Sequence, residues 1–306
     1  MSTTETDLPL LRITFDAEEI FFPGLPVLAG ESVEELFGVG RPVGRVGAFS
    51  LSQSGDWLLG AATVSLPSGL EEASHRLYGD IFEATRDWHL ARSWNYDPAI
   101  NESGPAGLEN YRVFCRGRSL AFEQLYGSGF NARLPSASAV GSKSGELTIA
   151  FAACPVRPRH VENPLQVPAY EYPGEYGPRA PSFARATVVP GPEQATVFIS
   201  GTAAIRGHAT VAPHSVREQV ECTLENLREL SRACGLGVDL DHGGDSTRHF
   251  KVYLRHATDL PLVATLLEEK LLAGTDRVSY VLSDMCRSSL LVEIEATLFG
   301  VTGLPA

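Results

Sequence analysis

Two glutamates lie two positions apart in a mainly apolar stretch near the C-terminus, SSLLVEIEATLFG. In a β-strand, alternate side chains share a face, so Glu293 and Glu295 would point to one side and Val292 and Ile294 to the other. A carboxylic acid in an apolar pocket holds its proton to higher pH and can donate it in catalysis. An antiparallel strand with one solvated face shows the same alternation, and the pattern alone favours that simpler interpretation.

A second group of chemically capable residues lies in the segment 155–182, PVRPRHVENPLQVPAYEYPGEYGPRAPS. Its seven prolines disfavour regular secondary structure, as in a linker. Its three tyrosines, which include Tyr172 and Tyr176, would be costly in a solvated linker. We therefore expect an ordered loop that packs on a functional site, where the hydroxyl groups could bind a substrate and the rings could exclude water.

Three arginines near these stretches could bind a carboxylate, because the planar guanidinium group can form two parallel hydrogen bonds with it. Arg179 and Arg185 flank the end of the proline-rich segment, and Arg287 precedes the C-terminal strand. Each could equally be a surface residue, but their grouping predicts at least one arginine in a site. The histidines show no spacing typical of a metal site, so no metal is expected.

Bulk properties narrow the class of function. A net charge of −12 over 306 residues argues against a nucleic-acid partner, which needs a basic surface, but permits a local cationic pocket. No apolar run approaches the length of a membrane-spanning helix, and the first residues do not resemble a secretory signal. The five cysteines include no Cys-x-x-Cys pair, which indicates reduced thiols in a cytoplasmic protein.

Two similar runs of elements would position these groups. Apolar periodicity predicts helices over about 69–89 and about 107–126 in the first half. In the second half, one helix is expected from the capping sequence at Ser215 to Gly235 and another over about 260–273. The strands VSYVLSDM and LLVEIEATLF are expected to pair with each other. The predicted fold class is α+β, with two related units that each consist of a sheet backed by two helices.

The second half of the chain resembles the RidA/YjgF family in the stretches PSFARA, FISGTAA, KVYLRHATDL and LLVEIEA. Over about residues 75–300 the chain resembles a narrower group, the chorismatases, in RSWNYDPAIN, GLENYRVFCRGRSLAFE and the long proline-rich segment. Plain RidA proteins lack that segment. The resemblance implies two RidA/YjgF-like (chorismate-mutase-like) units, residues 1–152 and 183–306, joined by an ordered connection over 153–182.

The resemblance to chorismatases implies cleavage of the enolpyruvyl ether of chorismate, with release of pyruvate and without a cofactor. The second product in the family is 3-hydroxybenzoate, in some members with 4-hydroxybenzoate, or a trans-dihydrodiol cyclohexadiene carboxylate. Glu293 matches the catalytic glutamate and is the expected proton donor. Cys286 and Ala203 match positions that line the site. The cysteine favours 3-hydroxybenzoate and the alanine favours hydrolysis, so the product stays open.

The same resemblance implies that chorismate, a dicarboxylate, binds against Arg179, Arg185 and Arg287 and the two tyrosines. Glu295 is expected nearer the strand end, either paired or solvated. The motifs SWNY and YRVFCRGR either touch the substrate or hold the two units together. RidA sites lie between subunits, and a second unit can supply that surface, so a monomer is expected.

Two other functions fit a RidA-like fold: imine or enamine deamination, and binding of a small molecule without catalysis. Deaminating RidA proteins use an arginine just before the strand that matches SYVLSDM. This chain has Val278 there, with Arg277 beside it, which puts deamination in doubt. A protein that only binds would tolerate the loss of Glu293 without losing its ligand.

Overall fold

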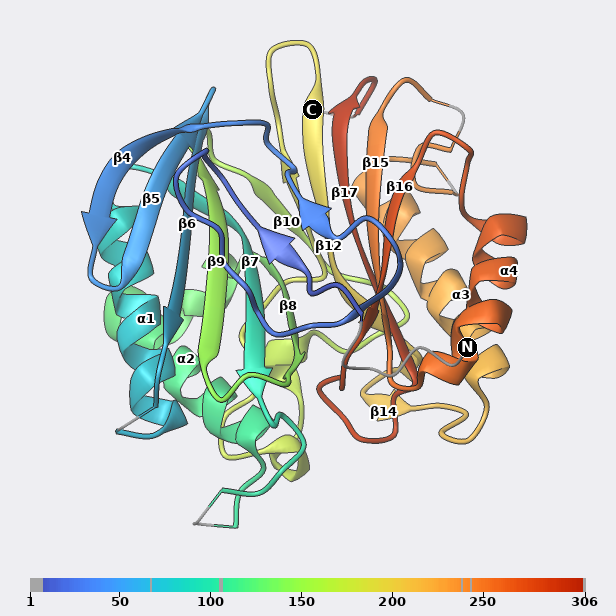
Figure 1. Cartoon of the computed structure of the whole chain (residues 1–306), viewed down its shortest axis with the longest axis horizontal. Coiled ribbons are helices and arrows are strands. Elements are labelled where there is room, and N and C mark those ends of the chain that lie inside the picture. The colour runs from blue at the N-terminus through green and yellow to red at the C-terminus, as the bar shows by residue number, and fades with distance from the viewer. Residues whose placement is uncertain (1–7, 67, 105–106, 238, 243, 305–306) are drawn as a thin grey trace.

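The computed structural model describes residues 8–66, 68–104, 107–237, 239–242 and 244–304. It contains two β-sheets that face each other, and each sheet carries two helices on its outer side (Figure 1). The predicted α+β class and the two units of a sheet backed by helices are confirmed.

The first unit is a six-stranded sheet covered by α1 (Leu70–Ala84) and α2 (Asn110–Tyr126). Both helices lie within their predicted ranges, and α1 buries Leu77 and Ile81 because these side chains recur at helical spacing on the face toward the sheet. A 3-10 segment, Gly127–Arg133, follows α2. In spatial order the strands are β4 (Arg41–Val46), β5 (Phe49–Ser54), β6 (Trp57–Val64), β9 (Leu147–Cys154), β7 (His89–Pro98) and β8 (Ser136–Ser142).

The second unit is a seven-stranded sheet covered by α3 (Val216–Cys234) and α4 (Leu260–Lys270). Its edge strands come from outside 183–306, because β10 belongs to the proline-rich segment and β2 to the N-terminal part of the chain. In spatial order the strands are β10 (Arg159–Val161), β11 (Ala186–Val189), β12 (Ala195–Ala203), β17 (Val292–Val301), β15 (Thr247–Leu254), β16 (Arg277–Leu282) and β2 (Val27–Gly30). Two short pairs lie outside the main sheets: β1 (Arg12–Ile13) with β3 (Val33–Glu34), and β13 (Ile205–Arg206) with β14 (Ala209–Thr210).

The ends of α3 follow the capping residues. The Ser215 hydroxyl accepts a hydrogen bond from the backbone N–H of Glu218 at 3.3 Å. Gly235 ends the helix with φ of 89°, in the left-handed region that glycine adopts without a Cβ clash. Both predicted ends of this helix are confirmed.

The predicted pairing of VSYVLSDM with LLVEIEATLF is wrong. β16 pairs with β15 in parallel, and β17 lies on the opposite side of β15. The reason is the connection through α4, a crossover of the kind that joins parallel strands and places β16 at the far side of β15. β17 is therefore a central strand, antiparallel to both β12 and β15.

The alternation of side chains along β17 does not reflect a solvated face. Val292 and Ile294 pack into the core beneath α3 and α4. Glu293 and Glu295 point the other way, toward the first unit, and are only 3% and 4% exposed. The interpretation of an outward, wet face is therefore wrong, because the second sheet covers this side of the strand.

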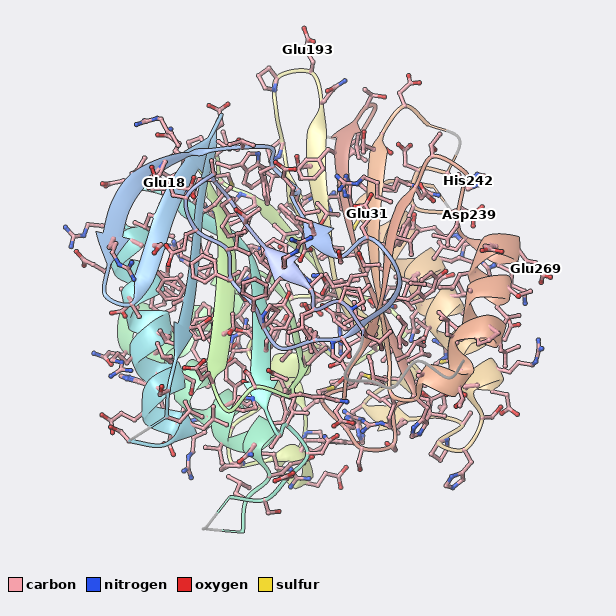
Figure 2. The ribbon with its side chains drawn as sticks, in the orientation of Figure 1. Glu18, Glu31, Glu193, Asp239, His242 and Glu269 are labelled. Atoms are coloured by element: carbon pink, nitrogen blue, oxygen red, sulfur yellow. The ribbon has the colours of Figure 1, made fainter. Side chains whose placement is uncertain are left out.

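The outer surface carries exposed acidic side chains. Figure 2 shows Glu18, Glu193, Asp239 and Glu269 at the periphery of the molecule. Any cluster of positive charge between the sheets is therefore a local feature of a protein that is acidic overall. In the part of the chain that the structure describes, no helix is both long and apolar enough to cross a membrane.

Candidate active site

A bulge in the neighbouring strand makes room for the side chain of Glu293. β12 pairs with β17 at Ile199 and again at Thr202, with a shift of register between these residues. Gly201 lies in this irregular stretch, and a Cβ atom at that position would be only 1.9 Å from Glu293 Oε1. The glycine therefore leaves the space that the carboxyl group occupies.

The carboxyl group of Glu293 lies in an environment that favours its neutral form. Among the described residues, no hydrogen bond or ion pair to this side chain is formed. Burial and the neighbouring anion Glu295 raise the pKa of Glu293 to about 8, although Arg92 and Arg185 act in the opposite direction. At neutral pH the group is mostly protonated and can serve as a proton donor.

A cavity lined by both units opens on Glu293, and it brings together most of the predicted site residues. Arg179 is the exception: it does not line the cavity and instead forms an ion pair with Glu123 of α2 at 2.7 Å. The predicted residues that line it are Tyr172, Tyr176, Arg185, Ala203, Cys286, Arg287 and Glu293. The lining residues that were not predicted are Glu109, Tyr111, Arg112, Pro181, Phe183, Gly201 and Ile205.

Three arginines line this cavity, and among the described residues two of them, Arg185 and Arg287, form no ion pair. Arg185 is buried and donates a hydrogen bond to the Tyr172 hydroxyl at 2.7 Å, while its Nε has no partner. Arg287 donates to the backbone oxygen of His208 at 2.8 Å and lies 4.3 Å from the centre of the Tyr176 ring. Within the described ranges neither guanidinium group forms an ion pair with a carboxylate, although Glu162 lies close enough to Arg185 to feel its charge, so both can bind an anionic ligand.

The proline-rich segment forms one wall of the cavity. Two short 3-10 turns, Ala169–Glu171 and Gly174–Tyr176, present the Tyr172 and Tyr176 rings with their centres 5.2 Å apart. The Tyr176 hydroxyl and His208 Nδ1 form a hydrogen bond of 3.1 Å. The prediction of an ordered loop rather than a linker is confirmed.

The inner part of the cavity is formed by α2, through a motif whose role the sequence left open. Tyr111, Cys115 and Arg118 of YRVFCRGR line it together with Glu293 and Cys286. Their spacing of four and three residues puts them on one helix face, and that spacing was the signal that could have identified them. Burial raises the pKa of the Cys286 thiol to about 12, so Cys286 acts here as a small neutral side chain.

Glu295 lies in a different environment from Glu293, although both share one face of β17. It forms ion pairs with Arg92 at 2.8 Å and Lys251 at 3.0 Å. Trp94 Nε1 donates to it at 3.0 Å, and the hydroxyl groups of Tyr253 and Ser138 also donate to it. Of the two predicted alternatives, the paired state is the one observed. Two of these partners, Arg92 and Trp94, belong to the stretch RSWNY, so this motif holds the two units together.

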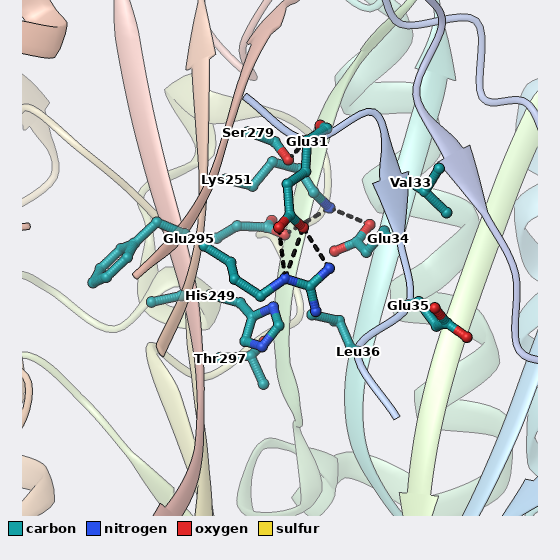
Figure 3. Close-up of a pocket in the computed structure, with 13 residues that line it drawn as sticks. Glu31, Val33, Glu34, Glu35, Leu36, His249, Lys251, Ser279, Glu295 and Thr297 are labelled. Atoms are coloured by element: carbon teal, nitrogen blue, oxygen red, sulfur yellow. Dashed lines mark hydrogen bonds and ion pairs between the residues drawn. The ribbon is translucent and has the colours of Figure 1, made fainter. Parts of the chain in front are cut away.

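A second, charged pocket lies on the other side of Glu295, between β3 and the second sheet (Figure 3). Lys251 forms ion pairs there with both Glu34, at 2.7 Å, and Glu295. Arg277 is paired with Glu31. The cations of this pocket are therefore already neutralised, which makes it a poor site for an anion. Among the described residues, no group of three or more His, Cys, Asp or Glu side chains could hold a metal ion.

Comparisons with known proteins point to one family. The family model "Chorismatase FkbO/Hyg5-like, N-terminal" matches residues 36–153. A 3-hydroxybenzoate synthase from Streptomyces hygroscopicus is 36% identical over 266 residues, which are 83% of this chain and 77% of that protein. The chain belongs to the chorismatase family. The resemblance identified from the sequence motifs is thereby confirmed.

Further chorismatases support this assignment. A protein named chorismatase, also from Streptomyces hygroscopicus, is 36% identical over 274 residues, covering 87% of this chain and 79% of that protein. A crystal structure of a chorismatase at 1.08 Å resolution has a TM-score of 0.78 and 31% identity to this chain, and covers 95% of this chain and 92% of the other. Chorismatase activity is favoured over imine deamination, since Arg277 is held by Glu31 away from the Glu293 cavity.

Proposed function

We propose that this chain is a chorismatase that cleaves the enolpyruvyl ether of chorismate, with Glu293 as the proton donor. The observation that carries the proposal is a buried, mostly neutral carboxyl group facing a cavity that contains two arginines without ion pairs among the described residues. A dicarboxylate needs such cations, and an enol ether needs such an acid.

We propose that Arg185 and Arg287 bind the carboxylates of chorismate and that Phe183, Ala203 and Ile205 pack against its ring. Arg112 also lines the cavity, but it pairs with Glu109 at 3.3 Å and is less available. Arg179 is not proposed as a ligand because its guanidinium group is paired with Glu123.

The reaction begins when the Glu293 O–H bond breaks and a C–H bond forms at the terminal methylene carbon of the enolpyruvyl group. The resulting oxocarbenium ion is trapped by a hydroxyl group, either of water or of the substrate, and the proton of that hydroxyl returns to Glu293. With water, the adduct is a hemiketal, and its remaining hydroxyl proton passes to the ring oxygen as the ether C–O bond breaks, which gives pyruvate and the dihydrodiol acid. With the substrate's own hydroxyl group, the adduct is a cyclic ketal. The bond from the pyruvyl carbon to the original ether oxygen then breaks, the ring C–O bond of the former hydroxyl breaks so that this oxygen leaves with pyruvate, and a ring C–H proton is transferred to the remaining oxygen as the ring becomes aromatic. Arg92 and Arg185 act electrostatically on Glu293 and stabilise its carboxylate in the interval between the two proton transfers.

We propose 3-hydroxybenzoate as the main second product. Its formation needs no added water, because 3-hydroxybenzoate and pyruvate together contain the atoms of chorismate. The apolar and aromatic walls of the cavity would exclude water, and Cys286 lies beside Glu293 at the position that favours this product. Ala203 lies in the same cavity, so a share of dihydrodiol acid is the expected minor outcome.

The purified protein should be incubated with chorismate, with pyruvate followed enzymatically and the aromatic acids separated by chromatography. We expect pyruvate in amounts equal to the sum of 3-hydroxybenzoate and dihydrodiol acid. No pyruvate above the spontaneous background would overturn the proposal. Pyruvate accompanied mainly by the dihydrodiol acid would retain the activity and overturn the product assignment.

We infer that a single chain suffices for activity, in line with the expected monomer. Tyr111 and Arg112 from the first unit and Arg185 and Glu293 from the second line one cavity. Light scattering during chromatography at the concentration used for the assay tests this. An active dimer that loses activity on dilution to monomer would contradict it.

A further inference from the structure

The carboxylate of Glu295 accepts hydrogen bonds or ion pairs from five side chains. Arg92 and Lys251 supply two positive charges, and Trp94 and Tyr253 donate neutral hydrogen bonds at 3.0 and 3.2 Å. The Ser138 hydroxyl donates a fifth. These donors come from β7, β8 and β15, so both units hold this one carboxylate. Its charge and orientation are therefore fixed by the fold.

None of these five donors forms a hydrogen bond or ion pair with Glu293, which lies two residues away on the same face of β17. Ser138 marks the boundary between the two carboxyl groups: it bonds Arg92 and Glu295, and it also lines the inner cavity with Glu293. The Ser138 Cβ is 3.2 Å from where a Cβ of Gly201 would lie, next to the Glu293 carboxyl. The two acidic groups thus lie in adjacent compartments that share a wall.

We propose that Glu295 is a positioning residue of the active site: a permanent, clamped anion whose charge keeps the catalytic proton on Glu293. The proposal rests on the function proposed above and adds a residue that does not touch the substrate. In this proposal Arg92, Trp94 and Ser138 do more than stabilise the fold. They keep Glu295 ionised, so that the catalytic proton stays on Glu293 and does not move to Glu295.

The electrostatics support this geometry. Burial alone would raise the pKa of Glu295, but Lys251 and Arg92 outweigh burial and hold that pKa below its usual value. After burial, Glu295 is the largest influence that raises the pKa of Glu293. The two carboxyl groups are thus driven apart, one to the charged form and one to the neutral form.

Charged and titratable groups face Glu293 from every surrounding element. Glu295 on β17 acts to raise its pKa, and Arg92 on β7 and Arg185 act to lower it. The other titratable groups that line its cavities come from three parts of the chain: Glu109, Tyr111, Arg112, Cys115 and Arg118 in and just before α2, Tyr172 and Tyr176 in the proline-rich segment, and Cys286 and Arg287 before β17. Among the described residues, Glu295 is the carboxylate that raises the pKa of Glu293, so its removal should lower that pKa; Glu109, which lines the same cavity, is paired with Arg112.

Lys251 offers a matched control because it joins two carboxylates. Glu34, on β3, pairs with the Lys251 ammonium group in the second, charged pocket, on the side opposite Glu295 (Figure 3). Glu34→Gln and Glu295→Gln each remove one partner of the same buried lysine. Glu34 is not among the groups that act on Glu293. Both variants take one carboxylate from Lys251, and only Glu295→Gln also takes one from Arg92 and removes the charge next to the proton donor.

The test is the pH dependence of kcat/KM for pyruvate release. In the wild type, activity should fall as pH rises through the pKa of Glu293. In Glu295→Gln that fall should move to lower pH by about one unit, and in Glu34→Gln it should stay in place. A profile of Glu295→Gln that is lowered at every pH without a shift, or a shift of equal size in Glu34→Gln, would overturn the proposal.

If Glu295→Gln does not fold, the double variant Glu295→Gln with Lys251→Met removes the opposite charges together. The loss of the Lys251 charge acts in the opposite direction, but Lys251 lies opposite Glu295 and not opposite Glu293 in the β15–β17 pair, so a smaller downward shift is expected. An unshifted profile in the double variant would overturn the proposal as well. A wild type that does not cleave chorismate would instead refute the proposed function, so the two failures are distinguishable.

Discussion

At the scale of single residues, two glutamates on one face of a strand reach opposite protonation states. Glu295 is satisfied by five donors, whereas Glu293 has no hydrogen-bond partner among the described residues and faces a cavity. Desolvation therefore dominates for Glu293, and nearby positive charge dominates for Glu295. Acid chemistry at neutral pH becomes possible because the protein pairs one carboxylate and leaves the other unpaired.

An unpaired buried acid has a measurable cost in stability. Glu293 takes up a proton near pH 4.5 in the unfolded chain but near pH 8 in the folded one. Between these values the folded state binds more protons, so stability falls as pH rises. Glu293→Gln removes this dependence. Its melting temperature should exceed that of the wild type by more at about pH 9 than at about pH 5.

Thermal unfolding followed by circular dichroism at both pH values measures this difference. A gap between wild type and Glu293→Gln that is the same at both values would contradict a raised pKa in the folded state.

The sequence identified Glu293 as a candidate, but it did not identify the side chains that bind the neighbouring Glu295. The family motif alone was enough to single out the proposed donor, because that signal is local, whereas the alternating pattern by itself favoured a solvated strand face. Arg92 and Trp94 lie about two hundred residues earlier in the chain, and no spacing rule connects them to Glu295. Arg179 shows the reverse error: it lies in the matched motif, but Glu123 on α2 is within its reach and removes it from the cavity.

At the scale of elements, the bulge between β12 and β17 is the feature that admits a carboxyl group into a sheet interface. Gly201→Ala would put a methyl group where Glu293 Oε1 now lies. We expect kcat to fall about 100-fold, since displacing a reacting group by about 1 Å can cost that much. KM should change less, because Arg185 and Arg287 remain in place.

Steady-state kinetics with chorismate test this, with Gly145→Ala as the control because a Cβ there would meet nothing within 4 Å. Equal kcat values for the two variants would show that the bulge does not place the donor.

Local sequence patterns did not predict the order of the strands in the second sheet. The two final strands looked like a hairpin because they are consecutive and apolar. The parallel pairing of β15 with β16 through α4 decides the order instead, and it places β17 at the centre of the sheet. β2 joins the edge of the second sheet over only four residues, too short a run for periodicity to reveal.

At the scale of the whole molecule, the two units share one polar centre between their sheets. The buried pair of Arg92 and Glu295 crosses that interface at 2.8 Å. Arg92→Met would leave Glu295 with one cation fewer in a buried site. We expect the free energy of unfolding to fall by roughly 3–5 kcal/mol, measured by denaturant titration.

Arg86→Met is the matched control, because Arg86, just after α1, forms an exposed pair with Glu83 and its loss should leave stability unchanged. If both variants lost the same stability, the interface pair would have no special role in joining the units.

The central claim is that Glu293 donates the proton that opens the enol ether of chorismate. The most direct measurement is the rate of pyruvate release from saturating chorismate by the wild type and by Glu293→Gln, which preserves the shape of the side chain and removes its acidic proton. The account predicts a loss of about 10²–10⁴-fold in kcat in a variant that remains folded. Turnover within a few-fold of the wild type would contradict it.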